Sequence, residues 1–376
     1  MHSHSLPSPS LPSPRLKVLR RDAPALAPPA AEPTHEPGPE LRVVVIGRDL
    51  GLRLERCLDS LAGRRVIYVD SGSRDGSPGR ARARGVTVVE LSPERPFTAA
   101  RGRNAGLARA LAEAGEAELL VQFVDGDCEL APGWLERGRD ALEEDPGLAV
   151  VCGRLRERDP QASVYQRLCD VEWDRPVGEV EEVGGLFLAR ARALRDAGGF
   201  REDLEAGEEP ELCLRLRRRG WRLRRISAPM AIHDAQMRRF AQWWRRQVRT
   251  GRGYATAVEL HGDGPERFCV RELRRVWGWG LLLPALALGC APPTLGASLL
   301  LLGAYPLSAA RTYRRLRRRG RAREDALAYA CACALDEVPQ LLGVLERHAA
   351  RSAPPAVELS GAAPAAPARA PAAPGG

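Results

Sequence analysis

An apolar run that ends in two aspartates constrains this chain more than any other stretch of its sequence. Residues Leu119–Asp127 read LLVQFVDGD, so a mostly apolar segment leads directly into Asp125, Gly126 and Asp127. An apolar run of this length without alternation predicts a strand buried on both faces of a parallel sheet. In an open α/β sheet, the carboxyl ends of such strands border the crevice that holds the ligand. We therefore expect the two aspartates to lie at a ligand site.

The two carboxylates indicate which kind of ligand to expect. Side by side they repel each other unless a cation lies between them, and hard divalent cations prefer oxygen ligands. Gly126 has no side chain, so a ligand could approach the backbone there. The pattern indicates a site for a metal ion and a diphosphate. An acidic turn that follows a strand is the alternative for so short a motif.

The charge balance suggests an anionic partner without choosing among the candidates. The 376 residues carry a formal net charge of +9, and almost all of the positive charge is arginine. A nucleotide, a nucleic acid or a negatively charged membrane leaflet would each suit such a chain. The nine cysteines form no CxxC pair and show no zinc-finger spacing, so we expect reduced thiols in a cytoplasmic compartment.

Strands and helices alternate along the first two thirds of the chain. Apolar segments bounded by polar turns predict strands at 41–47, 66–70, 86–91, 119–127, 148–154, 184–189 and 221–226. Helical periodicity and helix-start signals predict helices at 52–61, 99–114 and 132–144, and a further helix that begins at Glu208. This alternation is typical of an α/β fold with a doubly wound, mostly parallel, Rossmann-like sheet.

The last third of the chain carries the signals of a membrane-associated segment. Residues 276–310 contain no charged side chain, arginines flank them on both sides, and Pro292-Pro293 interrupt them near the middle. A spanning helix needs roughly 20 apolar residues, and positively charged flanks stay in the cytoplasm. These features predict a helical hairpin in or on the membrane, with a hairpin buried in a soluble domain as the alternative. Trp243 and Trp244, beside arginines, predict an interfacial helix.

Composition divides the chain further. Residues 1–40 and 351–376 are rich in Pro and Ala, which predicts disordered tails. Between them we expect a catalytic domain at 41–235, an interfacial helical segment at 236–275, the membrane hairpin at 276–310, and a basic, amphipathic helical segment at 311–350.

Several motifs of the predicted catalytic domain occur together and in a recognisable order. They are VVVIGR (43–48), YVDSGSRDGS (68–77), RGRNAGLARA (101–110), FVDGDCELAPGWL (123–135), GGF (198–200) and GEEPELCLRLRRRGW (207–221). In these motifs the chain from Leu41 to about His233 resembles the family 2 glycosyltransferases, which have the GT-A fold. The resemblance implies transfer of a sugar from a nucleotide-diphosphate donor, with a divalent cation, Mn²⁺ or Mg²⁺, as cofactor.

The resemblance also implies roles for individual donor-binding residues. Asp70 lies where the family's acidic residue binds the base of the donor, and a carboxylate can accept from the ring N–H of uracil. Arg103 matches an arginine that contacts the nucleotide, and Asp125 would face the ribose. Ser71 and Arg48, which follow the first two strands, complete the implied donor site, and the expected donor is a UDP-sugar.

The same resemblance implies the metal ligands and the base. Asp127, with Asp125 and His233, would hold the cation, which neutralises the diphosphate leaving group. Glu209 falls where inverting members keep an aspartate as general base, which takes the proton from the attacking acceptor hydroxyl. Because this chain has Glu208 and Glu209 at that place, the choice between the two stays open.

Two features bear on the acceptor. QWWRR at 242–246 resembles the QxxRW motif of processive polysaccharide synthases, with Arg246 in place of the final Trp. The apolar segment is much smaller than a polymer channel needs, so we expect transfer of a single sugar. A tethered enzyme meets lipid-linked acceptors at high effective concentration. The expected acceptor is therefore the hydroxyl or phosphate of a lipid-linked molecule or glycan of the cell envelope, at the anionic, cytoplasmic surface of a bacterial inner membrane.

Other functions fit the sequence less well. A nucleotidyltransferase would use the same crevice, but Gly47–Gly51 does not make the glycine-rich loop that such enzymes usually carry. A degenerate, non-catalytic protein that binds nucleotide-sugars at the membrane would not need the intact acidic residues. Nucleic-acid binding is not expected, because the arginines are spread along helices and form no recognised module.

Overall fold

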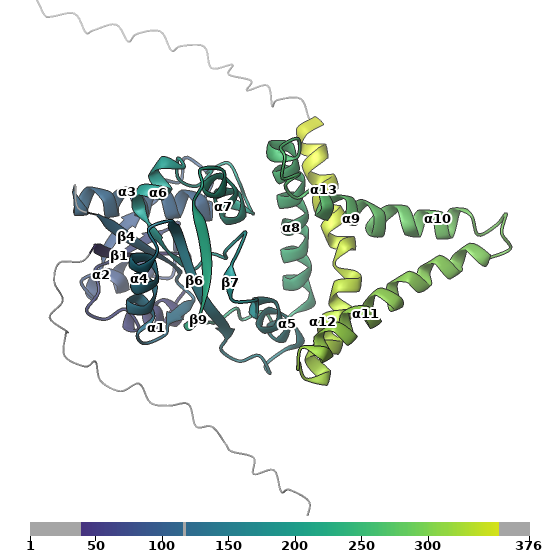
Figure 1. Ribbon diagram of the computed structural model, residues 1–376, viewed down its shortest axis with the longest axis horizontal. Helices are drawn as coiled ribbons and strands as arrows, with labels where there is room; N and C mark the ends of the chain where they lie inside the picture. Colours follow the sequence, from purple (N-terminus) through teal and green to yellow (C-terminus); the bar gives the residue numbers. More distant parts are fainter. Residues whose placement is uncertain (1–38, 116–117, 353–376) are drawn as a thin grey trace, which may run out of the picture. The chain divides into compact units, whose positions relative to one another are not determined.

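The computed structural model describes residues 39–115 and 118–352. Within these residues a nine-stranded sheet has the order β3-β2-β1-β4-β8-β6-β9-β5, and β7 pairs with β9 (Figure 1). The tails predicted to be disordered lie almost entirely outside the described residues.

The first half of the sheet is parallel, as predicted. β1 (Glu40–Gly47) lies between β2 (Val66–Asp70) and β4 (Leu119–Asp125), and β3 (Thr87–Glu90) pairs with β2. The register places Gly47 opposite Asp70 and Ile46 opposite Asp125. The carboxyl ends of β1, β2 and β4 therefore meet at one edge of the sheet.

The second half mixes strand directions. β8 (Phe187–Arg190) runs antiparallel to both β4 and β6 (Leu148–Glu157), and β9 (Arg222–His233) runs parallel to β6. β5 (Cys128–Leu130) and β7 (Gly178–Glu179) are antiparallel to β9. The predicted strand at 221–226 thus continues to His233, because partners distant in sequence pair with its second half.

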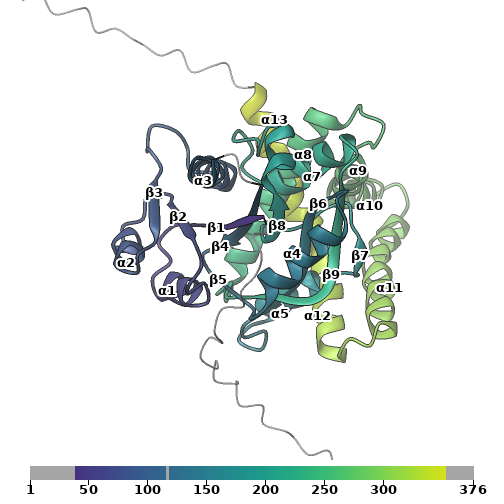
Figure 2. The same cartoon turned by 60° about the vertical axis from the view of Figure 1, so that its left-hand side comes forward.

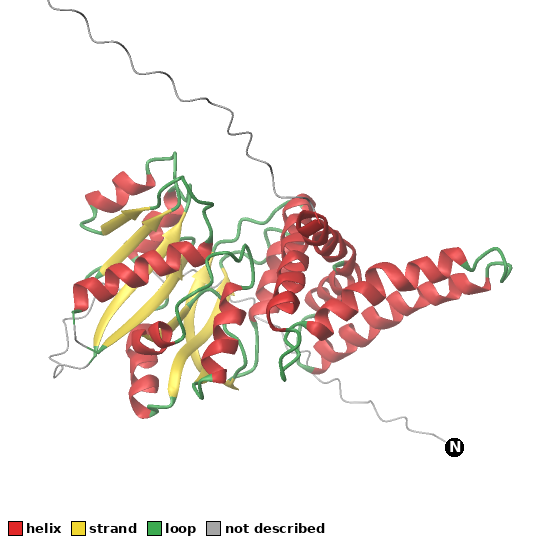
Figure 3. Ribbon diagram, turned by 90° about the horizontal axis from the view of Figure 1, so that it is seen from above, coloured by secondary structure: helices red, strands yellow, loops and turns green. Residues whose placement is uncertain are grey.

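Helices cover both faces of the sheet (Figures 2 and 3). They are α1 (Leu52–Asp59), α2 (Ser77–Ala83), α3 (Ala99–Ala114), α4 (Trp134–Glu144), α5 (Val164–Trp173), α6 (Ala191–Asp196) and α7 (Glu208–Arg218). α3 packs closely on β1, since a Cβ placed on Gly106 would lie 2.2 Å from Val44. The sequence did not predict α2, α5 or α6, which are short or lack a clear apolar stripe.

The C-terminal part is helical. It comprises α8 (Phe240–His261), α9 (Val270–Trp277), a π-helical turn at 278–282, α10 (Leu283–Gly289), a 3₁₀ segment at 297–303, α11 (Ala304–Arg318), α12 (Arg323–Leu335) and α13 (Glu337–Ser352). The backbones of α8 and α13 touch: a Cβ on Gly251 would lie 1.9 Å from the carbonyl oxygen of Gln340, and one on Gly343 equally close to that of Val248. α8 and α13 therefore form one close-packed pair, with Val344 and Ala255 in its core.

The apolar segment 276–310 forms a hairpin whose leucines face solvent. Its two arms meet at the tip and diverge towards α9 and α12 in Figure 1, and the chain reverses between Gly289 and Ala297, around the proline pair. Leu288, Leu295 and Leu300 are 63 %, 97 % and 83 % exposed. A hairpin buried in a soluble domain is therefore not what the structure shows.

One helical stretch among the described residues is long and apolar enough to cross a membrane, and it is 323–351 rather than the hairpin. It comprises α12 and α13, which lie almost entirely within the helical segment predicted at 311–350 and meet at Asp336. Of the most apolar part of this stretch, 39 % is buried, and α13 packs on α8. This stretch therefore also resembles a core helix of a soluble protein.

Candidate active site

The turn after β2 is held by Asp70. This carboxylate is 1 % exposed and accepts hydrogen bonds from the Tyr68 hydroxyl (2.7 Å), from the N–H groups of Gly72 (2.9 Å) and Ser73 (2.8 Å), and from the Ser73 hydroxyl. A carboxylate offers about four acceptor positions, so those of Asp70 are occupied by its own turn. The structure gives Asp70 a role in shaping this loop, and its contact with the base stays a prediction.

Arg48 and Ser71 flank the same turn. Arg48 is half exposed and lies over the Phe97 ring, with its guanidinium carbon 5.5 Å from the ring centroid. Ser71 donates its backbone N–H to the carbonyl oxygen of Gly47 at 3.0 Å. Both residues therefore border the strand-end edge, and the structure leaves the Arg48 side chain accessible.

Arg103, on α3, joins three carboxylates. Its guanidinium lies 3.0 Å from Asp125, 2.8 Å from Glu208 and 2.9 Å from Glu209, and the residue is 2 % exposed. Burial alone would lower the pKa of Arg103, but the three carboxylates outweigh it and raise that pKa. A buried arginine with three acidic partners positions those carboxylates, and the contact of Arg103 with a nucleotide stays a prediction.

The acidic pair opens α7. Gly207, in the left-handed conformation, precedes the helix, and the helix dipole favours carboxylates in its first turn. The Glu208 side chain is 8 % exposed and the Glu209 side chain 15 %. Burial raises the pKa of Glu209 to about 7, opposed by Arg103 and reinforced by Glu208. Glu209 is thus the more exposed of the two, and its pKa of about 7 lies near neutral pH.

Gly185 leaves room for this cluster. A Cβ at that position would lie 2.5 Å from the Arg103 guanidinium and 2.7 Å from the Asp125 carboxylate. At Gly126, by contrast, the nearby space is filled by the Leu50 side chain, which a Cβ there would approach to 2.4 Å. The absence of a side chain at Gly126 therefore serves packing against Leu50.

Asp127 and His233 lie together beyond the end of β4. The register of β5 and β9 places Cys128 opposite His233, which brings the imidazole Nε2 to 3.6 Å from Asp127 Oδ1. Burial raises the pKa of Asp127, and the charge of Asp125 adds to this, while His233 and Arg53 act in the opposite direction. Arg53 contacts the other oxygen of Asp127 at 3.5 Å.

A buried carboxylate stands behind His233. Glu157, whose side chain has no exposed surface, lies 3.2 Å from His233 Nδ1 and also accepts from the N–H of Ala235 at 3.1 Å. Trp173 packs edge-on against the same imidazole, with centroids 4.6 Å apart. This arrangement directs Nε2 towards Asp127. Sequence reasoning missed Glu157, because only the parallel register of β6 and β9 places it beside His233.

These residues fit a divalent cation. Among the described residues, the ligand atoms of Asp127, Cys128 and His233 lie within 4.8 Å of one another. Mg²⁺ and Mn²⁺ prefer oxygen ligands to thiolate sulfur, so the Cys128 thiol is the least suited of the three. The carboxylate and the imidazole therefore remain as the fitting pair, while the Asp125 carboxylate is held by Arg103.

The fold and the acidic strand-end site together define a protein of the GT-A class. A family model for glycosyl transferase family 2 matches residues 43–241. This match covers more than half of the chain, and the chain belongs to glycosyl transferase family 2.

Individual proteins with similar sequences or folds agree with this assignment. The chain is 30 % identical over 248 residues to a pre-mycofactocin glycosyltransferase of Mycobacterium tuberculosis, covering 62 % of this chain and 50 % of that protein. It is 24 % identical over 219 residues to the glycosyltransferase AglE of Haloferax volcanii, covering 53 % of this chain and 68 % of AglE. The chain thus spans about half the length of the first relative.

A solved structure shares the fold. The mannosyltransferase PcManGT of Pyrobaculum calidifontis, in complex with GDP-Man and Mn²⁺, has a TM-score of 0.52 at 21 % identity, and the match covers 81 % of this chain and 89 % of that one. The predictions of a GT-A fold and of a family 2 glycosyltransferase are therefore confirmed.

Proposed function

We propose that this protein transfers a single sugar from a nucleotide-diphosphate donor to a lipid-linked or glycan acceptor, with inversion at the anomeric carbon. The observation that carries the proposal is the joining of Asp125 to Glu208 and Glu209 by Arg103, beside Asp127 and His233. The carboxylates proposed for the donor and its cation, Asp125 and Asp127, thus lie at the same edge of the sheet as the pair proposed for the acceptor, Glu208 and Glu209. The names of the sequence relatives support sugar transfer.

Glu209 acts as the general base in this proposal. Its greater exposure favours it over Glu208. Its pKa, raised to about 7, suits a base that works near neutral pH. It takes the proton of the acceptor hydroxyl while that oxygen attacks the sugar. Arg103 holds Glu209 in place and limits the repulsion between the neighbouring carboxylates.

Asp127 and His233 would hold the divalent cation, with Asp125 nearby. A bound cation would offset the negative charge that develops on the departing diphosphate. The related fold of PcManGT was solved with GDP-Man and Mn²⁺, which supports this part of the proposal. A UDP-sugar is the donor that we would test first.

The exposed hairpin supports a membrane-bound acceptor. An apolar surface of this kind is expected to meet a membrane or a partner, and arginines flank it on both sides, among them Arg274, Arg275, Arg314 and Arg315. We propose that the hairpin lies in the cytoplasmic leaflet of an inner membrane and brings the catalytic domain to its acceptor.

The proposed function is tested by a donor screen with the full-length protein. UDP- and GDP-sugars are incubated with the protein in Mn²⁺ or in EDTA, and release of the nucleoside diphosphate is followed. We expect slow, Mn²⁺-dependent hydrolysis of one donor class. Metal-dependent binding of a nucleotide-sugar without any turnover, even with membrane extracts as acceptor, would favour the degenerate binding protein instead.

The pH dependence of turnover should report Glu209. Because the base works only when unprotonated and its pKa is raised to about 7, the rate should be constant above that pH and fall about tenfold per pH unit below it. Initial rates between about pH 5.5 and 8.5 measure this. A rate that is flat down to the lower limit would contradict the assignment.

Glu157 should matter for metal affinity. Replacing Glu157 by glutamine removes the negative charge behind His233, so we expect Mn²⁺ affinity to fall roughly 10- to 100-fold. Calorimetric titration with Mn²⁺ gives the constant without need of turnover. Glu136→Gln, at a half-exposed carboxylate on α4, is the control and should stay within about twofold of the parent protein. Unchanged affinity in Glu157→Gln would remove His233 from the proposed site.

The hairpin leucines should hold the protein at the membrane. Changing Leu288, Leu295 and Leu300 to asparagine removes about 1.5–3 kcal/mol of burial per side chain, so membrane partitioning should fall by more than roughly a hundredfold. Because these side chains are exposed, the melting temperature of the catalytic domain should not change. Fractionation of cells compares this variant with Leu52→Asn, a leucine 71 % exposed outside the hairpin. Retention of the triple variant in the membrane would contradict the hairpin's role.

A further inference from the structure

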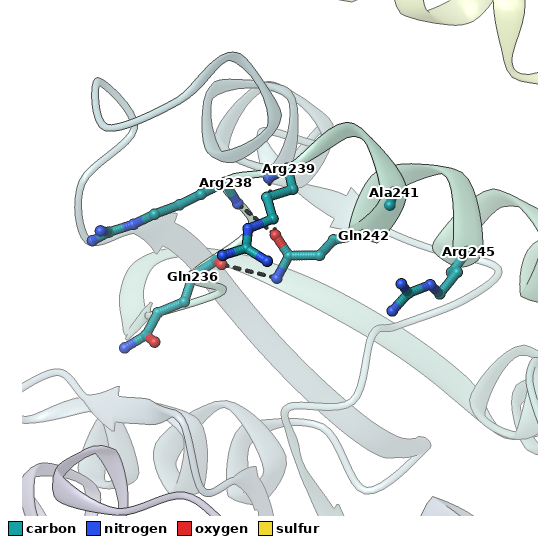
Figure 4. A pocket seen from close by; sticks show the side chains of 6 residues that line it. All are labelled: Gln236, Arg238, Arg239, Ala241, Gln242 and Arg245. Atoms are coloured by element: carbon teal, nitrogen blue, oxygen red, sulfur yellow. Dashed lines mark hydrogen bonds between the residues drawn. The ribbon is translucent and has the colours of Figure 1, made fainter.

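A pocket at the start of α8 plays no part in the donor site described above. Its volume is about 400 Å³, and it is lined by Gln236, Arg238, Arg239, Ala241, Gln242 and Arg245. Figure 4 shows the guanidinium groups of Arg239 and Arg245 on either side of the Gln242 side chain, while Arg238 extends away from them. The pocket is thus strongly basic.

The arginines of this pocket have no acidic partner within the described part of the chain. This is unusual here, since many arginines of the chain form ion pairs: Arg246, the next residue along α8, contacts both oxygens of Glu172 at 2.8 and 3.2 Å. The two arginines of the QWWRR motif therefore differ. Arg246 is paired with Glu172 of α5, whereas Arg245 is free to bind an anion.

The pocket is also preorganised. The side-chain oxygen of Gln242 accepts from the backbone N–H groups of Arg238 (2.8 Å) and Arg239 (2.9 Å), and its amide nitrogen donates to the carbonyl oxygen of Gln236 (3.2 Å). These bonds fix the loop that carries the arginines. The N-terminus of a 22-residue helix adds partial positive charge at the same place.

Short links connect the pocket to the proposed metal site. Gln236 donates to Asp234 at 3.3 Å, and the N–H of Asp234 donates to the carbonyl oxygen of Asp127 at 3.0 Å. Gln236 is three residues beyond His233, which limits their Cα separation to about 10 Å. The pocket therefore lies close to the proposed metal site.

Aromatic residues alternate along the chain with the residues that line the pocket. Phe240, 53 % exposed, lies at tilted angles to Trp243 and Trp244, with ring centroids 5.5 Å apart in each case. Trp243 belongs to a buried cluster against which Ala328 and Tyr329 of α12, the helix that follows α11, also pack. A basic pocket next to the exposed Phe240 ring suits a ligand with a charged head and an apolar body.

We propose that Arg239 and Arg245 bind the phosphate of the acceptor substrate. The planar guanidinium group matches phosphate oxygens in geometry and charge. The donor diphosphate has its own residues at the strand ends, so an anion in this pocket belongs to the second substrate. This inference rests on the proposed function and narrows its acceptor to a phosphate-bearing one.

The test uses the full-length protein in neutral phosphatidylcholine nanodiscs and two probes, inorganic phosphate and octyl phosphate. Binding is measured by calorimetry for the parent protein, for Arg239→Ala/Arg245→Ala, and for Arg249→Ala. Arg249 is an exposed arginine on the same helix that does not line the pocket, so it controls for general charge. Circular dichroism melting checks that every variant is folded.

We expect the double variant to bind both probes at least about tenfold more weakly, and Arg249→Ala to bind within about twofold of the parent protein. Octyl phosphate bound at least about tenfold tighter than inorganic phosphate would assign a lipid phosphate, since burial of its chain adds affinity. Equal affinities would assign a soluble phosphorylated acceptor.

Three results would overturn the inference. The first is that the parent protein binds no phosphate, and the second is that Arg249→Ala loses as much phosphate affinity as the double variant. The third is that the double variant loses Mn²⁺-dependent nucleotide binding, which would mean that the pocket binds the donor. A parent protein that binds phosphate but no nucleotide would instead refute the proposed function, so the two failures are distinguishable.

Discussion

Replacing Glu209 by glutamine should lower turnover by about 10²-fold or more while leaving donor affinity unchanged. Glutamine keeps the size of the side chain and can still contact Arg103, but it cannot take a proton. The proposed donor residues Asp70 and Asp125 lie on β2 and β4, so we do not expect this change to disturb them. Steady-state rates with a lipid acceptor, together with nucleotide titration, measure the two effects separately.

Glu208→Gln is the matched control for this result. Glu208 is more buried and lies 2.8 Å from Arg103, so its loss should lower the melting temperature and change turnover by less than about tenfold. The opposite pattern, with full activity in Glu209→Gln and a large loss in Glu208→Gln, would make Glu208 the base. Full activity in both variants would point to a mechanism without a carboxylate base.

The parallel half of the fold follows directly from the local sequence. The apolar runs at 43–46 and 119–124 are buried strands as predicted, and α3 has the predicted bounds, with Thr98 capping its first turn. Each of these elements buries its own apolar face. A local pattern therefore carries enough information to identify them.

The antiparallel half could not be predicted in this way. β5 and β7 are very short, and they exist because β9 offers them hydrogen-bonding partners. The extension of β9 to His233 depends on the same pairing. Such contacts join residues far apart in sequence, so a local pattern does not reveal them.

The candidate site, too, could be predicted only in part from the local sequence. The acidic residues at strand and helix ends could be identified from their motifs, but their partners could not. The resemblance to the family implied that Arg103 contacts the nucleotide, and the local sequence indicated no partner for Asn104. In the structure Arg103 joins three carboxylates, and the Asn104 amide makes two hydrogen bonds to the backbone of Phe200.

Asp127→Ala should abolish metal-dependent nucleotide binding. Asp127 lies 3.6 Å from the Nε2 atom of His233, whereas the Asp125 carboxylate is already held by Arg103. Without Asp127 the cation would keep a single firm ligand, and the diphosphate would lose its counter-charge. We expect UDP affinity in Mn²⁺ to fall by roughly 100-fold or more.

Calorimetric titration of UDP and of GDP into the parent protein and into Asp127→Ala, each with Mn²⁺ and with EDTA, measures this dependence. We expect the parent protein to bind one of the two nucleotides in Mn²⁺ and to lose that affinity in EDTA, and Asp127→Ala to behave in both conditions like the parent protein in EDTA. Equal nucleotide affinity in the parent protein and a folded Asp127→Ala variant, with or without Mn²⁺, would contradict the assignment of Asp127 to the metal site.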